Sequence, residues 1–225
     1  MAANEILVHL TPENEASRLN ALYQYEILDT TAEAGFDNIA LLASALFDSP
    51  EAHICFVDEH DVFYKASTGT SKTGRTPRAN SLCAHSILST EITTFCERQK
   101  ISDDIAFYVA APIINKDGFA LGTLAVSDHK PHQEATGQQL NMLGMLASLI
   151  VEKLETRLAD KKIALTYNER LRTLAHDIKN PVTSISLYAQ LLGSKEMNKE
   201  KVFSMAERID NSIKRIEEKL NNLFI

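Results

Sequence analysis

The strongest constraint on the fold of this chain is a change of sequence periodicity near Pro131. Before it, helix-like and strand-like segments alternate, and Asp117-Gly118 separates two β-rich runs. That pair is a strong tight-turn signal, because glycine accepts the positive φ that hairpin turns demand. After about residue 135, apolar residues recur at helical spacing and Pro181 is the one proline. The sequence therefore predicts an α+β domain followed by an all-helical segment.

Two helices and two strand pairs are expected in the first part. The helices are predicted at 12–28, after the capping residue Thr11, and around 36–46. Strand-like runs occupy 53–59, 62–68, 107–114 and 119–128. Antiparallel hairpins with helices before and after them predict an α+β domain, with an antiparallel sheet and the helices on one sheet face.

The second part predicts a helical hairpin. The stretch 193–200 is the one break in it, and Gly193 can end the first helix there. Apolar residues beyond the break follow one another at alternating steps of four and three, which is a heptad seam: Val202, Ala206, Ile209, Ile213, Ile216, Leu220 and Leu223. A hairpin with one apolar stripe on each helix cannot bury these stripes alone. We therefore expect a homodimer that forms a four-helix bundle.

Composition excludes several classes of partner. The 30 acidic residues outnumber the 23 Lys and Arg residues, and the net charge of -7 argues against nucleic acid or anionic lipid as the main partner. The N-terminus lacks the basic and apolar regions of a signal peptide. The longest nearly apolar run, 142–151, is about half the length of a membrane helix. We expect a cytoplasmic protein that binds neither nucleic acid nor membrane.

The cysteines give no sign of a metal site. Cys55, Cys83 and Cys96 are odd in number and widely spaced, and no Cys or His pair has the spacing of a zinc site. Reduced thiols and no bound metal are the expectation.

The stretch "AHDIKNP" at 175–181 is unusual for a helix. On a helical wheel of about 100° per residue, the apolar residues of this region fall within roughly one quarter of the circumference. His176 lies nearly opposite them, and Asn180 and Thr183 follow on the same outer face. A packed core histidine is therefore excluded, and an exposed surface histidine, a metal ligand and a reactive group remain.

The neighbours of His176 favour the reactive group. Asp177 can orient the imidazole or accept its proton, and the Asn180 amide can hold a water or a phosphoryl oxygen beside the ring. Pro181 costs a helix about 3 kcal/mol, and such an unfavourable choice often marks function. A metal site is weaker, because no second histidine or carboxylate stands three or four residues from His176.

These residues carry a resemblance to a known family. The stretch "LRTLAHDIKNPVTSISLYAQLL" resembles the phosphoacceptor box of sensor histidine kinases, and "RIDNSIKRIEEKLNNLF" resembles the second helix of the same dimerization and histidine-phosphotransfer (HisKA) domain. The resemblance covers about 165–225. It implies a protein-histidine kinase of a two-component system, that is, a transferase and phosphoprotein acting in a signal-transduction phosphorelay.

The resemblance also implies a role for each matching residue. His176 would be phosphorylated from ATP and would pass the phosphoryl group to an aspartate of a response regulator. Asp177 would act as the general base, Asn180 would position water in the phosphatase reaction, and Thr183 would be a candidate for regulator docking.

One part of the family pattern is absent from the sequence. The ATP-binding domain, which would bring ATP and Mg²⁺, should follow the second helix, and its motifs do not occur before Ile225. The expectation is a fragment of a longer kinase, completed by that domain in cis, or a natural truncation that is charged in trans.

The first part of the chain resembles a GAF domain. The resemblance rests on stretches at 18–47, 54–69, 81–88 and 111–131. Cys83 and His85 are candidate residues of its ligand pocket, although Ala84 separates them and bilin-attaching relatives place the two residues together. The alternative is a small buried thiol and a hydrogen-bonded histidine. The resemblance leaves the ligand unspecified.

The expected organisation is an N-terminal segment (1–14), a GAF sensory domain (15–155), a helical linker (156–168) and the phosphotransfer hairpin (169–225). The leading functional hypothesis is a cytoplasmic sensor histidine kinase, represented by its sensor and phosphoacceptor portion. Two alternatives stay open. One is a non-enzymatic GAF module that senses a ligand and dimerizes, and the other is a stand-alone phosphotransfer protein charged by another kinase.

Overall fold

The computed structural model describes residues 11–69, 74–79, 81–96, 105–193 and 198–221 of the chain. The chain divides into two compact units, Met1–Ala159 and Asp160–Ile225. The first holds the α+β domain and the second holds a helical hairpin.

The first unit is built on a six-stranded sheet in which all neighbouring strands are antiparallel, in the order β3-β2-β1-β6-β5-β4. Its helices and strands, in chain order, are α1 (Glu15–Gln24), α2 (Ala34–Phe47), β1 (Glu51–Val57), β2 (Asp61–Ser67), β3 (Gly74–Pro77), α3 (Leu82–Ser86), β4 (Thr93–Cys96), β5 (Phe107–Ile114), β6 (Ala120–Asp128) and the first part of α4 (Gly137–Leu192). The predicted α+β class and antiparallel sheet are thus confirmed.

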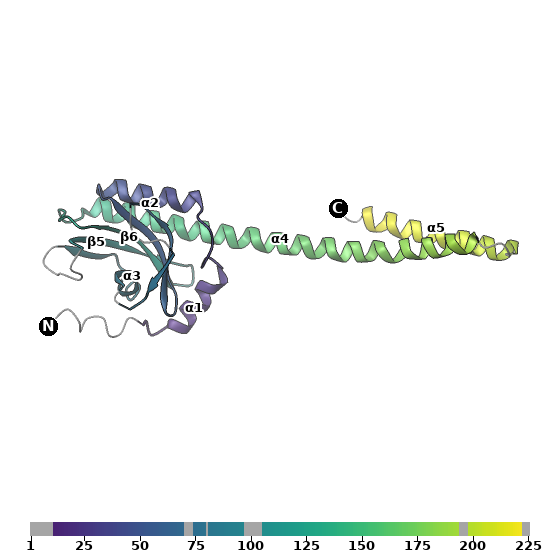
Figure 1. The fold of residues 1–225 in the computed structure, drawn as a ribbon, viewed down its shortest axis with the longest axis horizontal. Coiled ribbons are helices and arrows are strands. Elements are labelled where there is room, and N and C mark those ends of the chain that lie inside the picture. Colours follow the sequence, from purple (N-terminus) through teal and green to yellow (C-terminus); the bar gives the residue numbers. More distant parts are fainter. Residues whose placement is uncertain (1–10, 70–73, 80, 97–104, 194–197, 222–225) are drawn as a thin grey trace. The chain divides into compact units, whose positions relative to one another are not determined.

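The two faces of the sheet carry different layers. In β1, Ile54 and Phe56 pack into the main core, whereas Cys55 and Val57 join a second cluster on the opposite face. Side chains of a strand alternate between the faces, so each face is filled by every second residue. Figure 1 shows α2 and α4 over one face and α3 on the other. The helices predicted before and after the strands, α1, α2 and α4, all pack into the main core on one face as expected, whereas α3, which was not predicted, covers the other face.

The start of α4 completes the main core. Leu143, Ala147, Ile150 and Leu154 are buried there, because steps of three and four residues place them on one face of the helix. Their burial explains why the apolar periodicity of this segment is stronger than that of the polar stretch that follows.

The sequence located most of these elements, with four differences. No helix was predicted where α3 lies. The first helix runs only over Glu15–Gln24, shorter than the predicted 12–28. Strands β3 and β4, of four residues each, were not predicted. They lie at the two edges of the sheet, where a short strand needs no apolar alternation.

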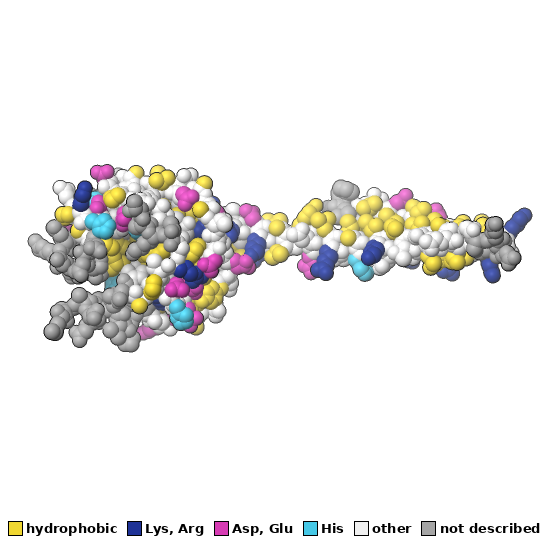
Figure 2. All heavy atoms as spheres, viewed as in Figure 1, with side chains coloured by type: hydrophobic (Ala, Val, Ile, Leu, Met, Phe, Trp, Pro, Cys, Tyr) yellow, Lys and Arg dark blue, Asp and Glu magenta, His cyan; other side chains and the backbone are white. Residues whose placement is uncertain are grey.

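The second unit is an antiparallel hairpin formed by the later part of α4 and by α5 (Lys199–Asn221). In the single chain none of the described residues of α5 is buried. Figure 2 shows apolar side chains along one side of this hairpin. Part of the predicted turn, 194–197, and the end of the predicted seam, Leu223, lie outside the described residues.

Within the described parts of the chain, no helix carries an apolar stretch long enough to span a membrane.

Candidate functional site

His176 is an exposed member of the predicted site. It lies in α4, and its side chain is 73% exposed, as the helical wheel predicts. Leu174 and Ile178, two residues on either side, are partly buried instead. The helix therefore presents the imidazole to solvent, where a second macromolecule could reach it.

Asp177 lies between His176 and the second helix of the hairpin. Its Oδ1 atom is 3.7 Å from Nδ1 of His176, which is too long for a hydrogen bond. Its Oδ2 atom accepts a hydrogen bond of 2.7 Å from Nζ of Lys219 in α5. The Lys219 ammonium lowers the pKa of the Asp177 carboxyl, and His176 contributes in the same direction. Asp177 is therefore an ionised carboxylate, held in place through one oxygen.

Lys219 was missed by the sequence analysis. It stands 42 residues from Asp177, so only the pairing of the two helices brings them together. The available signal was the hairpin itself: antiparallel helices place the end of the second beside the middle of the first. A second contact sets the same register, because Arg208 donates a 3.2 Å hydrogen bond to the Tyr188 hydroxyl and stacks over that ring.

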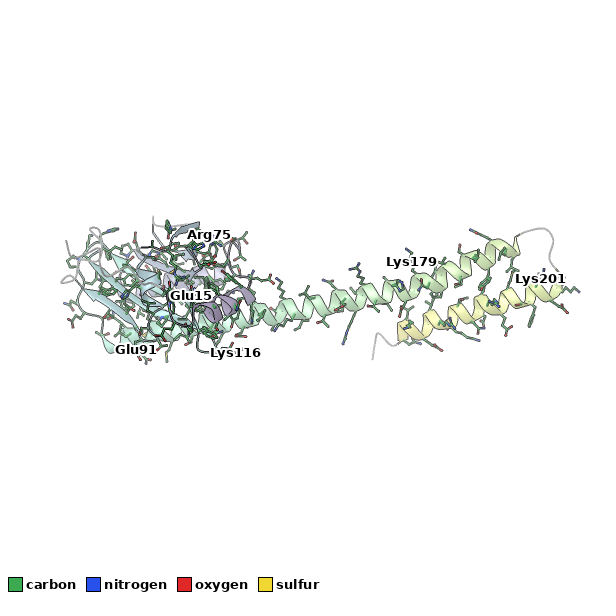
Figure 3. The ribbon with its side chains drawn as sticks, turned by 90° about the horizontal axis from the view of Figure 1, so that it is seen from below. Glu15, Arg75, Glu91, Lys116, Lys179 and Lys201 are labelled. Atoms are coloured by element: carbon green, nitrogen blue, oxygen red, sulfur yellow. The ribbon has the colours of Figure 1, made fainter. Side chains whose placement is uncertain are left out.

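Asn180 and Pro181 shape the next turn of α4. Pro181 lies inside the helix and has no amide hydrogen, so the Asp177 carbonyl loses its usual helical hydrogen bond. Thr183 and Ser184 use their hydroxyls within the helix, donating to the carbonyls of Lys179 (2.8 Å) and Asn180 (3.1 Å). Figure 3 marks Lys179 on this stretch.

Polar side chains on both sides of Pro181 face solvent. Asn180 and Thr183 are both exposed, one and two turns after His176. The structure thus brings His176, Asp177, Asn180 and Thr183 onto one accessible stretch of α4, and the roles given to them stay predictions.

The candidate ligand-pocket residues of the first unit are less exposed than His176. Cys83 and His85 both lie in α3; Cys83 is buried and His85 is half-buried. The ring of His85 lies 5.7 Å from that of Phe95, and among the described atoms its buried Nδ1 has no hydrogen-bond partner. Neither residue lines the cavity beside Arg18 or the cavity beside Ala147.

Described residues line two cavities on the first unit. One of about 500 Å³ lies between the start of α1 and the segment after α3, with Arg18 and Leu88 in its wall. The other, of about 210 Å³, lies between β5 and α4, beside Pro112 and Ala147. In the part of the chain that the structure describes, no group of three or more His, Cys, Asp or Glu side chains could hold a metal ion.

Comparison with known proteins agrees with the division of the chain into two units. Residues 25–154, more than half of the chain, match the model of the GAF domain, and residues 167–224 match that of the His Kinase A (phospho-acceptor) domain. A GAF domain followed by a phosphoacceptor domain is an organisation of two-component signalling proteins. The chain belongs to the GAF domain family, and its GAF and HisKA domains together place it with the two-component sensor histidine kinases.

One curated relative and several solved structures are similar to this chain. It is 30% identical over 156 residues to a cyclic di-GMP phosphodiesterase of Pseudomonas aeruginosa, over 64% of this chain and 26% of that protein. The chain thus spans about a quarter of the length of this relative.

Two solved GAF domains illustrate the structural similarity. The GAF-B domain of DevS from Mycobacterium smegmatis has a TM-score of 0.49 and 12% identity, over 58% of this chain and 97% of that one. The GAF domain of an Acinetobacter phosphoenolpyruvate-protein phosphotransferase has a TM-score of 0.48 and 16% identity, over 67% of this chain and 96% of that one.

Proposed function

We propose that this chain is the sensor and phosphoacceptor portion of a cytoplasmic sensor histidine kinase, and that His176 is its phosphoacceptor. The observation that carries the proposal is the exposed His176 imidazole beside an ionised Asp177, within the segment that matches the phosphoacceptor domain. An acceptor must be reachable by the γ-phosphate of a nucleotide held on another domain, and burial would prevent this.

Asp177 is the proton acceptor in this proposal. A carboxylate near the ring accepts or orients the proton of one nitrogen, so that the other nitrogen attacks phosphorus as a nucleophile. The 3.7 Å separation from Nδ1 is long, and such contacts often tighten only when substrate binds. Lys219 keeps the carboxylate ionised and limits its rotation.

The remaining partners follow from the same chemistry. A kinase ATP-binding domain, in cis or in trans, would hold ATP and Mg²⁺, and a response-regulator receiver domain would take the phosphoryl group from His176 to an aspartate. Asn180 would position the water that dephosphorylates the regulator, and Thr183 would lie in its docking surface. Both are exposed beside His176.

A homodimer through the hairpin is part of the proposal. Four apolar residues of the two helices are each at least 39% exposed in the single chain, although the HisKA segment contains them: Val182, Val202, Ile213 and Leu220. Burying this apolar surface against a second copy would remove it from water.

Helix α4 provides the route from sensor to acceptor in this proposal. The same helix contributes Leu143 and Leu154 to the core of the GAF unit and carries His176 further along. A signal that rotates or shifts the helix in the first unit would change the access of the kinase domain to His176. The nature of the signal stays open, and Cys83 and His85 remain the candidate pocket residues.

The test is a phosphotransfer chase. The chain is mixed with a separately expressed histidine-kinase ATP-binding domain and labelled ATP, and a receiver domain is then added. We expect label on the wild type that moves to the receiver, none on His176→Gln, and wild-type labelling of the matched control His129→Gln, an exposed histidine of the first unit. Equal labelling of wild type and His176→Gln would reject the assignment.

A further inference from the structure

Two buried cysteines meet on the α3 face of the sheet. Cys55 lies in β1 and Cys83 in α3, and their Sγ atoms are 2.7 Å apart. The S–S bond of a disulfide is about 2.05 Å, so the two sulfur atoms lie only slightly beyond bonding distance. The fold already brings these two side chains together, and forming a bond would need little movement of either element.

Polar atoms surround the two sulfurs within an otherwise apolar cluster. Sγ of Cys55 lies 3.1 Å from the Thr123 hydroxyl of β6, and the Tyr108 hydroxyl of β5 donates to Sγ of Cys83 over 3.9 Å. Tyr108 also lies 3.3 Å from the Ser86 hydroxyl in α3. These hydroxyls can accept and return the protons that thiol oxidation releases.

The pair differs from two inert core thiols in its sulfur contact, yet both residues are shielded from bulk solvent. Cys83 is 4% exposed and Cys55 is not exposed at all, so Cys83 is the thiol that an incoming molecule reaches first. Burial and the neighbouring Cys83 raise the pKa of the Cys55 thiol. A large thiol-exchange protein cannot reach either sulfur, whereas a small uncharged oxidant can.

We infer that Cys55 and Cys83 form a redox-sensitive disulfide site, oxidised by hydrogen peroxide. In the first step Sγ of Cys83 attacks a peroxide oxygen, the O–O bond breaks, and the thiol proton leaves with the departing oxygen as water. Cys83 is then a sulfenic acid, oxidised by two electrons. In the second step Sγ of Cys55 attacks that sulfur, the S–O bond breaks, and the Cys55 proton leaves with the hydroxyl as a second water.

The disulfide would join α3 covalently to the central strand β1. It would close a chain loop between positions 28 residues apart and restrict the unfolded state, so the oxidised domain is expected to melt at a higher temperature than the reduced one. The inference stands on this contact alone and does not require that His176 accept a phosphoryl group.

Cys96 provides a matched control. It ends β4, and strands β5 and β6 separate β4 from β1 in the sheet. With about 4.8 Å between neighbouring strands, its backbone is too far from Cys55 for a disulfide without rearrangement. Cys96→Ser should therefore leave the proposed cross-link unchanged.

The experiment treats the reduced full chain with hydrogen peroxide, alkylates it under denaturing conditions, and identifies peptides by mass spectrometry without reduction. We expect a Cys55–Cys83 linked peptide that dithiothreitol releases, in both the wild type and Cys96→Ser, and alkylated Cys96 in the wild type. Pairing of either residue with Cys96, or Cys83 oxidised to sulfinic acid without a cross-link, overturns the inference, as does full alkylation of Cys55 and Cys83.

Variants at the pair itself, Cys55→Ser and Cys83→Ser, are expected to lose the cross-link, provided that circular dichroism shows them folded. The wild type tests the same point without any substitution. Oxidation should raise its melting temperature and dithiothreitol should reverse the shift, as in Cys96→Ser. Equal melting of the oxidised and reduced wild type contradicts the proposed link between α3 and β1.

Discussion

The Tyr25 hydroxyl donates a 2.5 Å hydrogen bond to Oε1 of Glu155, and so fixes the segment after α1 to α4 across 130 residues of sequence. The same carboxylate lies 3.5 Å from Lys116 in the β5–β6 turn. Glu155 of α4 is thus held by two separate parts of the first unit. This contact lies where the helix leaves the GAF core, after its last buried residue, Leu154.

Tyr25→Phe should destabilise the first unit. The substitution leaves the ring in place and removes a charge-assisted hydrogen bond, which we expect to lower the free energy of unfolding by about 1–2 kcal/mol. Urea denaturation of the full chain measures the change. Tyr23→Phe is the matched control, because its hydrogen bond to Asp58 is exposed and its loss should cost about 0.5 kcal/mol or less. Equal costs would show that the Glu155 contact contributes nothing specific.

Gly122 should tolerate no side chain. A Cβ atom there would meet the Cys55 carbonyl oxygen at 1.9 Å, where β6 pairs with β1. Gly122→Ala must separate the central strands, and we expect a loss of about 3 kcal/mol or more in unfolding free energy. Gly137→Ala, at the open start of α4, should change it by only about 0.5 kcal/mol. A stable Gly122→Ala variant would contradict the pairing of β1 with β6.

Lys219 should set the pH at which the phosphorylation rate falls on acidification. The Lys219 ammonium lowers the pKa of Asp177, so the carboxylate persists to lower pH than an unpaired one would. In Lys219→Met that pKa rises towards its ordinary value, and the fall in phosphorylation rate on acidification should begin at higher pH. Initial rates measured across the acidic range give the comparison.

Lys214→Met is the control for this profile. Lys214 pairs with Asp210 at 2.7 Å within α5, so its loss removes the same charge without touching Asp177. Its pH profile should follow the wild type. Coincident profiles for Lys219→Met and the wild type would show that Asp177 does not serve the reaction as a carboxylate.

The heptad seam of α5 should be a dimer interface. Ile213 is 42% exposed in the single chain, and Ile213→Asp would place a charge on that seam. We expect at least a tenfold weaker dimer by light scattering coupled to size exclusion at micromolar concentration. Asn211→Asp adds the same charge at an exposed position off the seam and should leave the dimer intact. A monomeric wild type would refute the bundle.

Structural features that depend on local periodicity could be predicted from the sequence. Exposure of His176 followed from the positions of Leu174 and Ile178, because a helix has a fixed angular step. The strand pair β5–β6 followed from Asp117-Gly118, and Gly118 indeed has a positive φ. Strands β3 and β4 could not be predicted in this way, since edge strands of four residues carry little alternation.

Contacts between distant segments could not be predicted from the sequence. Nothing near Asp177 indicates Lys219, and nothing near Cys83 indicates Cys55, because each pair depends on how two elements pack. The side of the sheet that α3 covers is a third example. The apolar residues of α3, such as Ala84, suit either face, and the alternation of β1 alone does not say which helix each face receives.

Locating the phosphoryl group tests the role of His176 as phosphoacceptor most directly. The chain is incubated with a histidine-kinase ATP-binding domain, ATP and Mg²⁺, digested at neutral to alkaline pH, and analysed by tandem mass spectrometry, with an unrelated phosphoacceptor domain as positive control. We expect a phosphoryl group on His176 and on no other of the seven histidines. A phosphoryl group on another residue, or an unmodified chain beside a phosphorylated control, would contradict this role.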